Sequence, residues 1–293
     1  MAAIQVDLQF PPTSALEALR GETVVVKYGG HALAEGNGLQ AFAQDVAYLS
    51  RAEVHIVVVH GGGPEITAEM ERAGIKPQFV HGHRVTDAAS LAIVERVLSG
   101  KVNGSIVTAL EKMGVQAVGL SGRDGSLIKA RYRRPKVKGS DGKEVTVDLG
   151  YVGDVERVNR QLLSLLQGGG YTPVIAPLGV TSSGQALNIN ADAVAGAISG
   201  ALRASSCVFL TDVSGILADP LDPASLQRDV HARDARAQIA SGVISGGMIP
   251  KVQACLDALE HGASDSRIAD GRKPHALLNV LLPAEPAGTT LTA

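Results

Sequence analysis

The sequence has few of the residues that build several common kinds of site. Among its 293 residues there are two cysteines, five tyrosines, four phenylalanines and no tryptophan. Cys207 and Cys255 lie far apart without a C-x-x-C spacing, so we interpret both as buried thiols. Aromatic residues make up only 3% of the chain, which argues against stacking platforms for bases or sugars.

An excess of one charge and long apolar runs are also missing. Lys and Arg number 27 against 29 Asp and Glu, so nucleic-acid binding through general basicity is not expected. The apolar runs fall far short of the roughly 20 residues that cross a bilayer. The start, MAAIQVDLQF, has no basic region and no cleavable apolar segment, so we expect a cytoplasmic protein with no membrane partner.

Strand-like and helix-like segments alternate along the chain. The β-branched runs Val24–Lys27 and Ile56–Val59 are typical of strands buried on both faces of a parallel sheet. Further strands are predicted at 116–120, 172–176 and 207–211, and helices at 39–49, 64–73, 88–113 with an interruption at Gly104, 191–202 and 251–261. This alternation predicts a doubly wound α/β sandwich.

The segment Ser126–Val155 breaks the alternation. Two alternating runs flank a glycine-rich turn at 139–142, which predicts a β-hairpin. Six basic residues between Lys129 and Lys138 could form a phosphate or RNA patch, or simply a solvated flap. The flap is favoured because acidic residues follow at once and Tyr132 is the one aromatic among them.

Glycine turns end the first two strands. In VVVKYGGHAL, Lys27 precedes Gly29 and Gly30, and in HIVVVHGGGPEI the turn contains Gly62 and Gly63. Glycine lets backbone N–H groups approach a ligand, and ligands of parallel sheets bind at the carboxyl ends of the strands. Neither turn is a Walker A or G-x-G-x-x-G motif. An anion site is therefore indicated, although glycine also serves packing and a strand-ending lysine also snorkels to water.

Other polar residues follow in similar contexts. Arg84 in GHRVTD could bind a carboxylate through two parallel bonds, or form a surface ion pair. In LNINAD, Asn188 and Asn190 project the same way on an extended backbone, although Asn190 could equally cap the helix that contains Asp192. Lys251 in SGGMIPK is a second candidate phosphate ligand. Because this set contains no convincing nucleophile–base pair, it suits direct phosphoryl transfer, which depends on positioning and electrostatics.

Together these motifs resemble the amino acid kinase family, and within it the acetylglutamate kinases. The resemblance runs from about residue 22 to residue 290 and is carried by VVVKYGGHAL, VVHGGGPEI, HRVTDAASL, GKVN, GLSGRDG, LNINADAVA, FLTDVSGIL, SGGMIPKV and IADGRKPHALL. It implies a three-layer αβα sandwich around a mainly parallel sheet. An extension (1–21) would precede an N-terminal lobe (22–185) for the acyl amino acid and a C-terminal lobe (186–293) for the nucleotide.

The resemblance also implies a reaction and roles. MgATP would phosphorylate the γ-carboxylate of N-acetyl-L-glutamate, the second step of arginine biosynthesis. Lys27 and Lys251 would stabilise the transferring phosphoryl group, and Asp192 would hold both lysines in position. The substrate would contact Gly62, Gly63, Arg84, Asn188 and Asn190. ATP, with Mg²⁺ among its phosphates, would contact Gly29, Gly30, Thr211, Asp212, Gly215, Gly247 and Met248.

Some positions depart from the family pattern. His31 replaces the usual asparagine after KYGG, and His83 replaces the usual leucine before RVTD. His81 and His83 lack a third ligand, so no protein-bound metal is predicted. Arginine-inhibited members carry a glutamate about where Val280 lies here, and an N-terminal helix that links dimers into hexamers. The resemblance therefore implies absent or altered arginine feedback and a homodimer through the N-terminal lobe, with hexamer formation open.

Three other functions compete with this interpretation. A kinase for an aminoadipate derivative would share almost every motif, and only the pocket beside Arg84 and Asn188 would separate the two. Kinases for uridylate, carbamate or aspartate share the fold without the combined RVTD and NINAD motifs. A catalytically silent amino-acid sensor is disfavoured because Lys27, Lys251 and Asp192 are all present.

Overall fold

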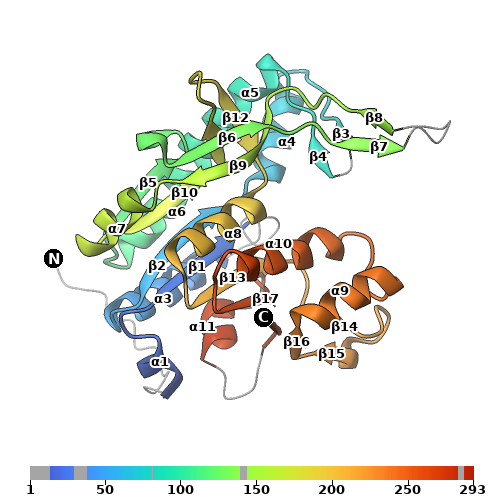
Figure 1. Ribbon diagram of the computed structural model, residues 1–293. Coiled ribbons are helices and arrows are strands. Elements are labelled where there is room, and N and C mark those ends of the chain that lie inside the picture. The colour runs from blue at the N-terminus through green and yellow to red at the C-terminus, as the bar shows by residue number, and fades with distance from the viewer. Residues whose placement is uncertain (1–13, 30–37, 81, 139–143, 283–286) are drawn as a thin grey trace.

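The computed structural model describes residues 14–29, 38–80, 82–138, 144–282 and 287–293. Its centre is an eight-stranded sheet in the order β16-β18-β17-β13-β1-β2-β10-β5 (Figure 1). Within the described residues, every pairing in this sheet is parallel except that of β17 with β18. The strands are β1 (Thr23–Tyr28), β2 (His55–His60), β5 (Ala117–Ser121), β10 (Thr172–Ala176), β13 (Ser206–Thr211), β16 (Asp229–His231), β17 (Asp265–Asp270) and β18 (Thr289–Thr292). The predicted mainly parallel sheet is confirmed.

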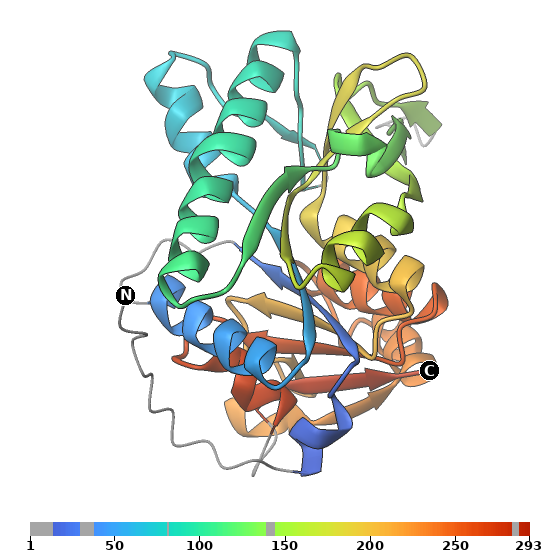
Figure 2. The same cartoon turned by 90° about the vertical axis from the view of Figure 1, so that its left-hand side faces the viewer.

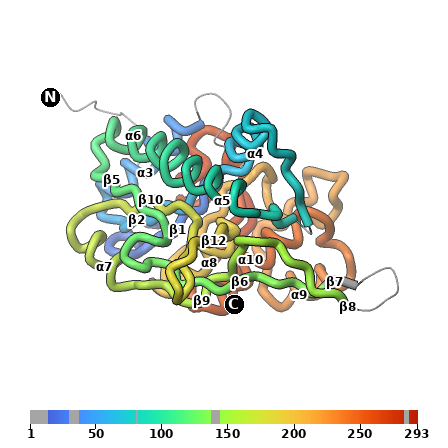
Figure 3. The backbone as a smooth tube through the Cα atoms, turned by 90° about the horizontal axis from the view of Figure 1, so that it is seen from above, coloured from blue at the N-terminus to red at the C-terminus, as the bar shows by residue number. Residues whose placement is uncertain are grey.

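Side chains of the central strands are buried on both faces of the sheet. In β1, Val24 and Val26 belong to one hydrophobic cluster and Val25 belongs to the other, as the period-two alternation of a strand requires. The first face is covered by α3 (Gly38–Arg51), α6 (Asn103–Lys112) and α11 (Ala276–Leu281), and the second by α7 (Arg160–Gly168), α8 (Ala191–Leu202) and α10 (Met248–Glu260). Figure 3 shows α3 and α6 on the opposite side of β1, β2 and β10 from α7. The three-layer sandwich is therefore confirmed.

A second, smaller sheet closes on itself beside the main one. It contains β6 (Ile128–Tyr132), β9 (Val152–Val158), β12 (Ala186–Ile189) and β11 (Leu178–Val180). The antiparallel pair β7 (Lys136–Lys138) and β8 (Glu144–Thr146) extends from it as an arm (Figure 1). The predicted hairpin is confirmed, while its turn at 139–142 lies outside the described residues. Arg133 pairs with Asp154 at 2.5 Å and Lys136 with Glu144 at 3.2 Å, so acidic partners neutralise part of the basic cluster.

The interruption predicted at Gly104 is wrong. The helix α5 (Ala88–Glu95) continues into a π-helix at Arg96–Val102, and α6 then begins at Asn103. Gly104 lies inside α6 and faces open space, so its missing side chain does not break the helix. The π turn breaks the helical repeat instead, and such turns occur often at functional sites. Asn103, directly after it, is 4% exposed.

The remaining elements are short or lie at the edges. They are α1 (Ser14–Ala18), α4 (Gly63–Arg72), β3 (Phe79–Val80), β4 (His83–Arg84), β14 (Ile216–Leu217), β15 (Leu226–Gln227), α9 (Ala232–Ser241) and single 3₁₀ turns at Asp124–Ser126 and Pro223–Ser225. Cys207 and Cys255 are free and buried, as predicted. In the part of the chain that the structure describes, no helix combines the length and apolar character needed to cross a bilayer.

One sheet runs through both predicted lobes. Strands β1, β2, β10 and β5 come from the segment 22–185, and β13, β17, β18 and β16 come from 186–293. Figure 2 shows the C-terminal strands, in red and orange, below the green helices of the N-terminal half. The lobe boundary at 185/186 stays a prediction, but the sheet places the carboxyl ends of strands from both halves side by side.

Candidate active site

The two glycine turns meet at the carboxyl edge of the sheet. Strands β1 and β2 are neighbours, and Lys27 is in register with Val59. The N–H of Gly61 donates to the carbonyl of Tyr28 at 2.9 Å. A Cβ atom on Gly29 would lie 2.7 Å from the backbone nitrogen of Gly61, closer than real packing allows. Position 29 therefore requires glycine, because the two turns approach each other closely there. Gly30 and His31 lie outside the described residues.

Lys27 is held by a carboxylate at the edge of the site. Its Nζ lies 3.0 Å from Oδ1 of Asp192, and the two side chains are 12% and 16% exposed. Asp192 is fixed in turn, because its N–H donates to Oδ1 of Asn190 at 2.7 Å. Asn190 is thus the N-cap of α8, one of the two roles expected for it. Lys27 does not reach into open water, so the alternative of a snorkelling lysine is wrong.

A pocket of about 180 Å³ lies beside this ion pair. All five residues expected to bind the acyl substrate line it, which are Gly62, Gly63, Arg84, Asn188 and Asn190. Much of the remaining wall is apolar and comes from Ile66, Phe79, Leu98, Val152, Pro177 and Ile189. A few polar groups in a mostly apolar cavity are typical of small-molecule sites.

Arg84 is a buried cation in this pocket. It is 8% exposed, and its Nη2 donates to Thr67 Oγ1 at 2.8 Å and to the carbonyl of Gly63 at 3.1 Å. Its guanidinium carbon lies 4.7 Å from the ring centroid of Phe79. Burial lowers the pKa of the guanidinium. Among the described residues, no carboxylate forms an ion pair with Arg84, so the alternative of a surface ion pair is not what the structure shows.

Asn188 connects the far wall of the pocket to Arg84. Its Nδ2 donates to Oγ1 of Thr86 at 3.3 Å, and the Thr86 hydroxyl donates to the carbonyl of Arg84 at 3.0 Å. Thr86 is fully buried. The following helix, α5, is capped by Asp87, whose Oδ1 accepts from the N–H of Ser90 at 2.8 Å. Within the RVTD motif, Thr86 therefore holds the backbone of Arg84, and Asp87 begins the helix that follows.

A second pocket, of about 400 Å³, lies at the end of β13. Of the residues expected to contact the nucleotide, Asp212, Gly215 and Met248 line this pocket, whereas Thr211 and Gly247 adjoin it in sequence without being part of its lining. Sequence reasoning missed most of its apolar wall, which comes from Val213, Ile216, Leu217, Pro220, Pro223, Val243 and Ile244. A flat heterocycle such as adenine suits an apolar wall of this kind.

Gly215 has a specific backbone role in this second pocket. Its φ of 145° lies in a region that other residues rarely adopt, and a Cβ there would meet Oγ1 of Thr289 at 2.4 Å. The same hydroxyl accepts from the N–H of Ile216 at 2.8 Å. Arg272, also missed, lines the pocket and donates from Nε and Nη2 to the two oxygens of Asp270. Hydrogen bonding to Arg272 lowers the pKa of Asp270. The only sequence signal for Arg272 is its position in DGR, directly after a strand.

The two lysines have different partners. The resemblance implies that Asp192 holds both of them, but among the described residues Asp192 pairs with Lys27 alone. Lys251 instead lies 3.7 Å from Oδ1 of Asp212, which also accepts from the hydroxyl of Thr211 at 2.9 Å. Asp192, from α8, thus holds Lys27 next to the pocket of about 180 Å³. Lys251, from α10, is instead paired with Asp212, which lines the pocket of about 400 Å³.

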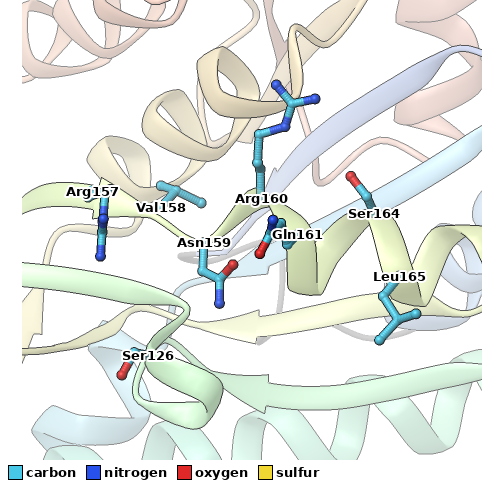
Figure 4. Close-up of a pocket in the computed structure, with 8 residues that line it drawn as sticks. All are labelled: Ser126, Arg157, Val158, Asn159, Arg160, Gln161, Ser164 and Leu165. Carbon is cyan, nitrogen blue, oxygen red and sulfur yellow. The ribbon is translucent and has the colours of Figure 1, made fainter.

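A larger, open hollow of about 970 Å³ lies at the start of α7. It shares no lining residue with the two pockets described above. Figure 4 shows that its polar groups diverge, since the guanidinium of Arg160 points away from the carboxamide of Asn159. Binding sites need convergent polar groups, so we do not take this hollow as the functional site.

Residues 22–270 match the sequence profile of the amino acid kinase family. The chain belongs to this family. An acetylglutamate kinase from Methanocaldococcus jannaschii is 47% identical over 94% of this chain and 92% of that protein. An acetylglutamate kinase from Symbiobacterium thermophilum is 50% identical over 92% of this chain and 91% of that protein.

Solved structures show the same amino acid kinase fold. An N-acetylglutamate synthase from Neisseria gonorrhoeae, complexed with coenzyme A and N-acetyl-glutamate, superposes with a TM-score of 0.79 and 25% identity. The match covers 95% of this chain and 61% of the synthase. A carbamate kinase from Giardia lamblia bound to AMP-PNP superposes with a TM-score of 0.63 at 16% identity, over 93% of this chain and 98% of that one. The latter likeness concerns the fold alone.

The two aspartates give a matched pair of stability predictions. Asp192→Asn should lower the free energy of unfolding by roughly 1–3 kcal/mol, because it leaves the largely buried Lys27 without its counter-charge. Asp212 is 44% exposed. Asp212→Asn should therefore cost less than about 0.5 kcal/mol. Urea denaturation of both variants beside the parent chain measures the difference, and equal losses would show that burial does not distinguish the two ion pairs.

Proposed function

We propose that this chain is an acetylglutamate kinase, which transfers the γ-phosphoryl group of MgATP to the γ-carboxylate of N-acetyl-L-glutamate in arginine biosynthesis. Two relatives that carry this name match over more than nine-tenths of the chain, at 47% and 50% identity. One structural observation supports it best. Arg84 is a buried guanidinium without a carboxylate partner among the described residues, in a pocket of about 180 Å³. Such a group favours a small ligand that brings its own carboxylate.

The proposed binding mode assigns one group of the substrate to each polar element. Arg84 binds the α-carboxylate, and Asn188 contacts the acetylamino group. The N–H groups of Gly62 and Gly63 bind the carboxylate that is phosphorylated. All four residues line the same pocket. The adenine base of ATP packs on the apolar wall that includes Ile216 and Leu217, so the phosphates point to the lysines.

The proposed chemistry requires no general base. A carboxylate is ionised at neutral pH, so its oxygen attacks the γ-phosphorus directly and ADP leaves from the opposite side. Lys27, from the end of β1, neutralises charge on the transferring group from the substrate side. Lys251, in the first turn of α10, does so from the nucleotide side. A mechanism in which two lysines neutralise charge agrees with the absence of a convincing nucleophile–base pair in the sequence.

Magnesium enters as part of the substrate MgATP. In the described part of the chain, no cluster of three His, Cys, Asp or Glu residues could hold a metal ion. Mg²⁺ keeps several waters and is often bound chiefly through phosphate oxygens, so this site fits a metal that the nucleotide brings. Asp212 lines the second pocket beside Lys251 and is 44% exposed, so it is the carboxylate that would contact such a metal.

Acyl-phosphate formation tests the proposed function directly. The purified chain is incubated with MgATP and one acceptor, and the product is trapped with hydroxylamine. N-acetyl-L-glutamate should react, while N-acetyl-aminoadipate and free glutamate should react at least about tenfold more slowly, because a methylene or a lost acyl contact changes the fit of a small pocket. Preference for the aminoadipate derivative would assign the chain to the sister activity. No reaction from a folded chain that binds ATP would exclude both.

Arg84 should act on substrate binding more than on turnover. Arg84→Lys keeps the charge but loses the two-pronged geometry, so the KM for N-acetyl-L-glutamate should rise roughly ten- to hundredfold while the KM for ATP changes less than about twofold. Lys251→Ala should instead mainly lower kcat. Arg96→Lys is the matched control, since Arg96 is 64% exposed and pairs with Glu69 outside the pocket. Equal effects of Arg84→Lys on both KM values would mean that Arg84 holds the fold rather than the substrate.

Feedback by arginine is expected to be absent or altered. Val280, at the position where the resemblance places a glutamate, is 4% exposed in α11. Its carbonyl accepts from the chain's own Arg267 at 2.6 Å. A buried valine offers no charge to a free guanidinium, so addition of arginine to the hydroxamate assay should inhibit the reaction weakly or not at all. Strong inhibition at micromolar arginine would refute this expectation.

We propose a homodimer formed through the N-terminal half and leave hexamer formation open. A biosynthetic kinase that uses MgATP is expected in the cytoplasm.

A further inference from the structure

A buried histidine directly precedes the glycine turn of the small pocket. His60 ends β2 and is 0% exposed. Its Nδ1 lies 2.8 Å from the carbonyl oxygen of Gly61, and its Nε2 lies 3.1 Å from Nδ2 of Asn103. Both ring nitrogens are therefore in contact with fixed neighbours, one of which belongs to the turn that lines the pocket.

The neighbours of Asn103 fix the position of the proton on His60. Asn103 Nδ2 also lies 2.9 Å from the carbonyl of Val174, which can only accept, so this atom must be the donor end of the carboxamide. Nε2 of His60 then accepts from Asn103, which leaves the proton on Nδ1. Nδ1 therefore donates to the carbonyl of Gly61. Burial lowers the pKa of His60 to about 4, so the ring is neutral at physiological pH.

Asn103 is itself set firmly into the sheet. It is the first residue of α6, directly after the π-helix, and is 4% exposed. A Cβ atom on Gly119 would lie 2.1 Å from its Oδ1, so β5 must have glycine where the carboxamide packs. The side chain thus contacts β10 through Val174, β5 through Gly119 and β2 through His60. This arrangement leaves the imidazole little freedom to rotate.

The hydrogen bond from His60 determines the orientation of one peptide plane. Because a peptide unit is planar and trans, the carbonyl of Gly61 and the N–H of Gly62 point in opposite directions. The N–H of Gly61 is held by Tyr28 at 2.9 Å, and its carbonyl is held by His60. Within the described residues the N–H of Gly62 donates to no protein group, and Gly62 lines the pocket. A donor fixed in advance stabilises developing negative charge better than one that must reorient.

We propose that His60 and Asn103 are positioning residues, which hold the Gly61–Gly62 peptide so that the N–H of Gly62 is directed at the carboxylate undergoing phosphorylation. The proposal rests on the proposed function for the identity of that carboxylate. Neither residue touches the substrate. They act through the backbone of the turn, so their loss should change turnover without changing the nucleotide pocket.

Steady-state kinetics of substituted chains test this role. His60→Leu removes both hydrogen bonds and should lower kcat by roughly ten- to a hundredfold, with the KM for ATP within about twofold of the parent value. In His60→Asn the amide nitrogen takes the place of Nδ1, so most of the lost kcat should return. His55→Leu, at the other end of the same strand, is the matched control and should leave kcat and both KM values unchanged. A folded His60→Leu chain with the parent kcat would overturn the proposal.

A double-substitution cycle separates a shared role from two structural ones. Asn103→Ala frees the imidazole, so it should lower kcat in the same direction as His60→Leu. If the two residues act as one unit, the double variant should lose no more than the more damaged single variant. Independent, multiplicative losses would mean that Asn103 and His60 act separately, and would contradict the proposal.

The ¹⁵N spectrum of the imidazole shows which ring nitrogen of His60 carries the proton, and it requires no activity assay. His60, assigned by comparison with His60→Asn, should be protonated at Nδ1 only and should not titrate between about pH 5 and pH 8. Protonation at Nε2 would overturn the proposal even in an active chain. If the parent chain fails to phosphorylate N-acetyl-L-glutamate while this spectrum is as expected, the proposed function fails and the role of His60 in holding the turn stands.

Discussion

The site depends on positive charge that is buried at the carboxyl edge of a parallel sheet. Removing a cation from water is costly unless an anion or a set of acceptors replaces the lost hydration. Lys27 has the carboxylate of Asp192, whereas Arg84 has a carbonyl, a hydroxyl, a sulfur atom and an aromatic face. A guanidinium solvated only by neutral groups retains its full attraction for an anionic ligand, so Arg84 suits ground-state recognition. A ligand of Lys27 must compete with the carboxylate of Asp192 for the ammonium group. The concentrated charge of a transferring phosphoryl group competes more strongly than the charge of a bound carboxylate, so Lys27 suits the transferring group.

Much of the fold and of the small pocket could be predicted from the sequence. The β-branched runs indicate β1 and β2, because strands buried on both faces need apolar side chains at every position. Periods of two and 3.6 place most elements within one to three residues, and α8 at its observed bounds. The glycine turns and the RVTD and NINAD motifs are local, so they could be recognised in the sequence, whereas their assignment to one pocket follows from the resemblance to the amino acid kinase family. The failed interruption at Gly104 has a clear cause, because a π turn depends on packing and glycine in a helix need not break it.

Contacts between distant segments could not be predicted in this way. Nothing in the local sequence links His60 to Asn103, 43 residues later, or Asn103 to Val174, 71 residues later. The same is true of the apolar wall of the second pocket, whose members look like ordinary loop residues. Lys251 pairs with Asp212 rather than Asp192 because the direction of α10 relative to β13 places it there. Such partners are set by the packing of whole elements.

The π-helix illustrates how packing and chemistry are coupled here. Its wider turn ends at Val102, and the next side chain, Asn103, enters the space between β2, β5 and β10. A regular α-helix through the same residues would rotate α6 relative to the sheet, since the π turn contains an extra residue. Asn103 would then lose its hydrogen bonds to the carbonyl of Val174 and to Nε2 of His60 at the same time. A backbone irregularity that packs against the pocket through Leu98 would in this way determine which direction a single N–H group in the pocket faces.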